Sequence, residues 1–96
     1  MSDIDYIIAL FERKFGLLTE KQDYSCESVT LERQELDEDL LPEYFDELDT
    51  DIELLVYLYN VAEYTVYILA DVEDSKWYLL GIIKQDKLIY YQLFDD

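Results

Sequence analysis

Four runs rich in aromatic and β-branched residues fill the second half of this chain and limit what it can fold into. Residues of this kind favour strands, because their side chains pack well on a pleated, half-buried surface. The polar breaks between the runs are short, and breaks of this length suit antiparallel hairpins. The runs are ELLVYLYN (53–60), YTVYILADV (64–72), KWYLLGII (76–83) and KLIYYQLF (87–94).

Alternation along the first run gives the sheet two apolar faces. Two helices can cover only one of them. The other face either displays tyrosines to solvent or to a partner, or carries them half buried with no binding role, because a tyrosine ring is apolar and its hydroxyl is polar. The two faces hold Leu54, Val56 and Leu58 on one side, and Leu55, Tyr57 and Tyr59 on the other.

The first part of the chain has the apolar spacing of a helix from Asp3 to Phe15. Ser2 or Asp3 is expected to cap its start, and Gly16 to end it. Asp23–Val29 then reads as a short strand. The apolar stripe of the helix consists of Ile4, Ile7, Ile8, Phe11 and Phe15.

A second, short helix is expected to begin near Leu41 or Pro42 and to end near Asp49. Proline is favoured at the first helical position, because the N–H group that it lacks would have no intrahelical partner there. Together these elements predict an α+β fold, with two helices packed on an antiparallel β-sheet of about five strands. At 96 residues the chain is one domain, spanning 1–96.

The chain is strongly acidic, with 24 acidic and 7 basic residues and a net charge of −17. Such a body repels nucleic acid and attracts basic surfaces, so the expected partner is a cationic protein. The longest uncharged run, Leu54–Ala62, is far shorter than the ~20 residues that cross a bilayer. The N-terminus lacks the pattern of a secretory signal. We therefore expect a soluble, cytoplasmic protein that does not contact membranes.

Acidic residues concentrate in one segment, 26–49, which holds ten carboxylates and a single base. A calcium-binding EF-hand loop is disfavoured, because it needs a glycine that this segment lacks. Acid–base catalysis by paired carboxylates is disfavoured as well, since so small a fold offers little cleft. With one cysteine, Cys26, and no histidine, the chain has no Cys/His zinc site or thiol dyad. Two interpretations of this acidic segment remain: a solvated acidic face, and a mimic of the DNA phosphate backbone.

An ordered set of short motifs resembles the uracil-DNA glycosylase inhibitors, especially the staphylococcal-type family. Cys-Glu-Ser-Val (26–29) is similar to that family's Cys-Glu-Ser-Ile strand. After an acidic spacer, Asp-Leu-Leu-Pro-Glu-Tyr (39–44) is similar to its Asp-Ile-Leu-Pro-Asp-Gln-Tyr helix start. The phage-type inhibitor shares the shorter core Glu-Ser-Ile and Leu-Pro-Glu-Glu. The resemblance covers nearly the whole chain, but the spacer is longer here and Val29 replaces isoleucine.

The resemblance implies where a partner would bind. Residues 27–29 would lie on a strand in the enzyme's DNA groove, and two carboxylates of the second helix would extend the path. Three apolar side chains of that helix would help to enclose the residue that the enzyme normally wedges into DNA. With the flanking Leu-Pro pair, the implied partner-binding residues are Glu27, Ser28, Val29, Leu40, Leu41, Pro42, Glu43, Phe45, Glu47 and Leu48.

The function that the resemblance implies is DNA-mimicking, stoichiometric inhibition of a family 1 uracil-DNA glycosylase in a one-to-one complex. Such an inhibitor is not an enzyme and needs no cofactor or metal, and we expect it to be a monomer when free. Two alternatives stay open. The chain could mimic DNA towards a restriction or CRISPR nuclease, or it could be an acidic adaptor for a basic protein.

Overall fold

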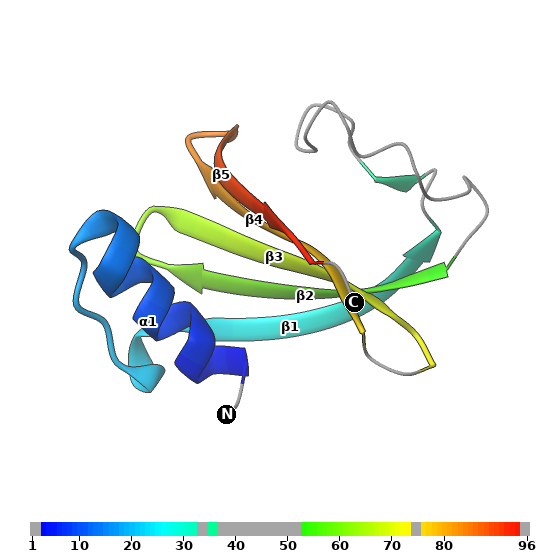
Figure 1. Cartoon of the computed structure of the whole chain (residues 1–96), viewed down its shortest axis with the longest axis horizontal. Coiled ribbons are helices and arrows are strands. Elements are labelled where there is room, and N and C mark those ends of the chain that lie inside the picture. The colour runs from blue at the N-terminus through cyan, green and yellow to red at the C-terminus, as the bar shows by residue number, and fades with distance from the viewer. Residues whose placement is uncertain (1–2, 33–34, 37–52, 74–75, 95–96) are drawn as a thin grey trace.

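The computed structural model describes residues 3–32, 35–36, 53–73 and 76–94, and within them one helix packs on one face of a five-stranded sheet (Figure 1). A single 3-10 turn links the helix to the first strand. The elements are α1 (Asp3–Phe15), η1 (Lys21–Asp23), β1 (Ser25–Glu32), β2 (Glu53–Val61), β3 (Tyr64–Asp71), β4 (Trp77–Lys84) and β5 (Lys87–Leu93).

The sheet is an antiparallel meander with the strand order β1-β2-β3-β4-β5. Each of the four aromatic runs forms a strand, which confirms the hairpins predicted from the sequence. The β4–β5 hairpin turns through Gln85 and Asp86, both with positive φ angles (53° and 63°). Positive φ at both central residues is the mark of a type I′ turn, whose twist matches that of the paired strands.

Helix α1 buries its apolar stripe against one face of the sheet. Ile7, Leu10 and Phe11 are fully buried, whereas Ile8, which the spacing assigned to the stripe, is only half buried. Gly16 ends the helix in the left-handed region (φ 64°), and its N–H donates to the Glu12 carbonyl over 3.1 Å. Packed against the helix are Tyr59, Val61, Val66, Ile68, Leu80 and Ile82.

The opposite face of the sheet carries a second apolar cluster. Leu54, Val56, Tyr67, Leu69 and Leu79 form its buried part, and Leu58 packs against it. The predicted alternation along β2 is therefore correct, because residues 54, 56 and 58 share this face while Tyr57 and Tyr59 lie with α1. We call this surface the second face.

The fold class is α+β with an antiparallel five-stranded sheet, as expected. The described residues contain one α-helix rather than two, because the helix predicted from Leu41 or Pro42 to Asp49 lies outside them. No helix among the described residues is long and apolar enough to cross a membrane.

Candidate functional site

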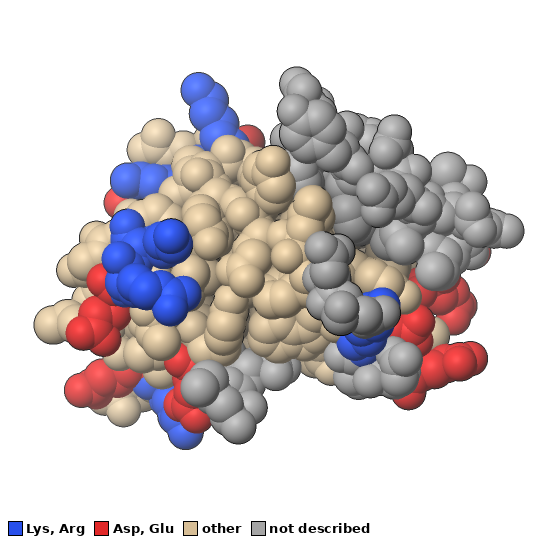
Figure 2. All heavy atoms as spheres, viewed as in Figure 1, with Lys and Arg blue, Asp and Glu red and all other residues tan. Residues whose placement is uncertain are grey.

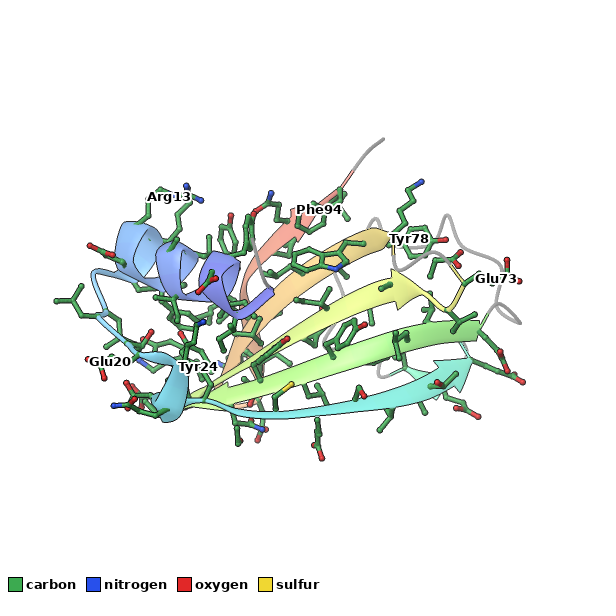
Figure 3. All side chains as sticks on the ribbon, turned by 90° about the horizontal axis from the view of Figure 1, so that it is seen from below. Arg13, Glu20, Tyr24, Glu73, Tyr78 and Phe94 are labelled. Atoms are coloured by element: carbon green, nitrogen blue, oxygen red, sulfur yellow. The ribbon has the colours of Figure 1, made fainter. Side chains whose placement is uncertain are left out.

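Strand β1 carries the Glu-Ser-Val motif and forms one edge of the sheet. It pairs with β2 along its whole length, from Ser25 opposite Asn60 to Glu32 opposite Glu53, with no interruption in register. No described strand pairs with its other side. The side chains of residues 25–30 are exposed, and they project freely at the margin of the sheet (Figure 3). An edge strand of this kind is a ready surface for a partner.

Side-chain contacts hold the segment that leads from α1 into β1. The hydroxyl groups of Thr19 and Tyr24 are hydrogen-bonded at 2.7 Å, and the Tyr24 ring lies 6.3 Å from that of Phe11 in α1. Burial is the main cause that raises the pKa of Tyr24, so its hydroxyl keeps its proton to a higher pH than that of a free tyrosine. The start of β1 is thereby tied to the helix and its core.

The motif residues point to both sides of the sheet, because directly opposed residues in an antiparallel pair share a face. Glu27 is opposite Leu58 and Val29 is opposite Val56, so both belong to the second face. Ser28 is opposite Tyr57 and belongs to the helix face. A groove that received this edge would meet a carboxylate and a valine on one wall and a serine beside a tyrosine on the other.

The motif residues also lie next to apolar surface. Val29 is 40% exposed, whereas its neighbour Val56 on the second face is only 4% exposed. Further along the same row, Leu31 is opposite the fully buried Leu54. An apolar side chain of a partner that reached past Val29 would therefore come close to a cluster that already excludes water.

Charge is divided unevenly over the surface. Figure 2 shows basic and acidic side chains side by side at the α1 end of the molecule, and a group of acidic ones where β1 ends and β2 begins. No residue of β1 is basic, and it contributes the carboxylates of Glu27 and Glu32. The Glu32 N–H donates to the carboxylate of Glu35 at 3.3 Å, so Glu35 is held at the end of this strand. The candidate edge therefore carries negative charge at Glu27 and at its end, where Glu32 and Glu35 lie together.

The predicted site is thus divided between described and undescribed residues. Glu27, Ser28 and Val29 lie together, exposed, on one edge strand. The other seven predicted residues lie outside the described residues, and they are Leu40, Leu41, Pro42, Glu43, Phe45, Glu47 and Leu48. Sequence reasoning missed Tyr57, Val56 and Leu58 as neighbours of the motif, because alternation gives the face of a residue but not its partner on the next strand.

The tyrosines do not form an open binding face in the part of the chain that the structure covers. Among the nine tyrosines that the structure describes, Tyr59 and Tyr67 are buried and only Tyr91, at 39%, is exposed. Most of the others are half buried around α1, where their rings contact one another and the helix. The tyrosines expected on the uncovered face, Tyr57 and Tyr59, lie instead on the face that α1 covers.

No cluster of three or more His, Cys, Asp or Glu side chains suited to a metal ion occurs among the residues described. The thiol of Cys26 is free and exposed on β1. Comparisons with protein-family models, with curated proteins and with solved structures find no match to this chain.

Proposed function

We propose that this protein is a DNA-mimicking, stoichiometric inhibitor of uracil-DNA glycosylase. The observation that carries the proposal is the position of Glu27, Ser28 and Val29, which are exposed together on an edge strand that has two carboxylates and no base. The resemblance of the motifs requires such a strand. The described helix, Glu-Ser strand and four aromatic strands follow one another in the order that the resemblance implies, and the Leu-Pro helix expected between them lies outside the described residues.

In this proposal β1 enters the DNA-binding groove of the enzyme. Each residue of a strand advances about 3.3 Å, so Glu27 and Glu32 are about 16 Å apart along β1, the length of roughly five phosphates on one DNA strand. Carboxylates on such an edge present charge to the serine, lysine and backbone N–H groups that normally hold phosphates. Because Glu27 and Ser28 point to opposite faces, each would contact a different wall of the groove.

An apolar anchor would complete the interface. The resemblance assigns Leu40, Phe45 and Leu48 to a pocket that encloses the enzyme's DNA-wedging side chain. The strand register now supports candidates for the sheet side of that pocket, namely Val29, Val56 and Leu58. Carboxylates accelerate association, whereas a buried apolar contact slows dissociation, so the combination gives a tight complex.

The decisive experiment is to titrate the protein into a uracil-excision assay with a bacterial family 1 uracil-DNA glycosylase at physiological salt. Complete inhibition close to one-to-one stoichiometry is expected. Absence of inhibition at large excess would remove the proposal, and the same preparation would then be tested against restriction and CRISPR nucleases. A protein that binds the glycosylase without inhibiting it would instead be an adaptor.

The role of Glu27 is tested by Glu27→Gln, measured as the association rate with the glycosylase. We expect a roughly threefold slower association at low salt, because an interfacial charge acts mainly on the on-rate. The difference from the unchanged protein should shrink as salt screens the charge, while dissociation changes little. Glu73→Gln, which removes the same charge from an exposed turn, is the matched control. Equal association rates for Glu27→Gln and the unchanged protein would exclude Glu27 from the interface.

A further inference from the structure

The second edge of the sheet, strand β5, has backbone groups free to pair. The Phe94 N–H donates to the Tyr78 carbonyl at 3.1 Å, so Phe94 faces β4. Alternate residues of an antiparallel strand face the same neighbour, so Gln92 and Tyr90 also face β4. The N–H and C=O groups of Tyr91 and Leu93 therefore point to the outer edge, where no described strand pairs with them.

The same two residues carry exposed apolar side chains. Leu93 is 48% exposed and Tyr91 39%, and the adjoining Ile89, at the irregular step of the β4–β5 pair, is 44% exposed. Tyr91 and Leu93 are opposite Gly81 and Leu79, so both side chains lie on the second face. Unpaired backbone groups and uncovered apolar surface thus coincide on one short strand, the arrangement that strand-to-strand association uses.

Charge indicates which partner fits this edge. Residues 76–96 contain three lysines and three aspartates and are neutral, so the entire net charge of −17 lies in residues 1–75. A strongly basic partner would bind elsewhere on the molecule. A second copy of this chain, which the acidic parts repel, meets no like-charge penalty at the β5 edge itself.

We infer that two copies of the chain associate through antiparallel pairing of their β5 strands. The contact is isologous, with Tyr91 and Leu93 of each copy meeting the β5 edge of the other. It joins the two sheets into one of ten strands, with β1 at both outer ends. Lysine at position 87 and the irregular step near Ile89 restrict pairing to the last part of the strand. The dimer is therefore weak, with a dissociation constant of roughly 10–100 μM for so small an interface.

At the nanomolar concentrations of an inhibition assay the chain is consequently a monomer. In the dimer both β1 edges remain open, so each copy keeps its own site. The inference therefore does not depend on the proposed inhibition, and the two can fail separately.

Sedimentation velocity over a concentration series that brackets this range tests the dimer. The mean mass should rise from 11.5 kDa towards twice that value. Added salt should strengthen association, because it screens the repulsion between two acidic bodies while leaving apolar contacts in place. A chain that stays monomeric across the series, or that dissociates as salt rises, would overturn the inference.

Leu93→Lys tests the location of the interface, and Leu18→Lys is its matched control. Leu18 is 77% exposed in the segment after α1, so it receives the same substitution away from β5. We expect at least tenfold weaker association for Leu93→Lys and none of this loss for Leu18→Lys. Tyr91→Lys repeats the test, and circular dichroism confirms the fold of each variant. Association that survives in folded Leu93→Lys and Tyr91→Lys would place the interface elsewhere and refute the inference.

Discussion

At the scale of single residues, the pair Tyr67 and Gly81 shows how the second face is packed. The two residues are opposite each other on β3 and β4, and the Tyr67 ring lies across Gly81, where a β-carbon would overlap the ring. Glycine is needed here for space, not for backbone conformation. Tyr67 is thereby held nearly flat on the sheet and is only 5% exposed.

Gly81→Ala should lower the free energy of unfolding by about 1–3 kcal/mol, the usual cost of an added methyl group in a packed core. Urea unfolding measures this loss. In a Tyr67→Leu background, which removes the ring, the same substitution should cost much less. An equal cost in both backgrounds would mean that the Tyr67 ring is not the obstacle.

Burial also raises the pKa of Tyr67 well above its ordinary value of 10.0. The folded state therefore keeps the phenol protonated at a pH where the unfolded chain ionises it. Stability should be insensitive to this group below about pH 10 and should fall as the pH rises from there towards the folded-state pKa. Ultraviolet titration of phenolate should show at least one tyrosine that ionises only on unfolding. Ionisation of every tyrosine in the folded protein would contradict this prediction.

At the scale of elements, the hairpins could be predicted from the sequence, but the residue-by-residue register of β1 on β2 could not. The four aromatic runs and the spacing of α1 predicted five elements with ends correct to within two residues. Their short breaks determined which strands are neighbours. The alignment of β1 with β2 was not predictable, because the 20 residues between Glu32 and Glu53 are too long a link to fix the register from the sequence. For the same reason Tyr57 was not recognised beside Ser28.

The β4–β5 turn gives a prediction at this scale. Gln85 and Asp86 both adopt positive φ angles, which cost most side chains free energy. Gln85→Asn combined with Asp86→Gly should raise the free energy of unfolding by about 1 kcal/mol, since Asn-Gly favours this turn. Thermal unfolding is the measurement. Asp86→Asn removes the same charge without supplying glycine, so it should raise the free energy of unfolding by less. An equal rise would mean that the lost charge, not the turn, causes the effect.

At the scale of the whole molecule, one helix ties together strands that would otherwise meet only their neighbours. Tyr6 of α1 donates a hydrogen bond to Gln92 Oε1 of β5 at 2.9 Å, and its ring lies 5.7 Å from that of Trp77 in β4. At its other end, Phe11 and Phe15 contact Tyr64 of β3. The helix thus packs on residues of β2, β3, β4 and β5, whereas β1 contributes no buried residue to this core.

The meander has a consequence for how the chain folds and opens. Strands β2 to β5 are joined by links of two to five residues, so they can assemble from local contacts, whereas β1 must close a 20-residue gap to reach β2. β1 should therefore join last and detach first. Native-state hydrogen exchange should show the β1 amides opening at a lower free energy than those of β3 and β4, and equal protection would contradict this order. The strand proposed to bind the enzyme would then be the least stable strand of the sheet. Binding of the enzyme would be expected to slow hydrogen exchange of the β1 amides.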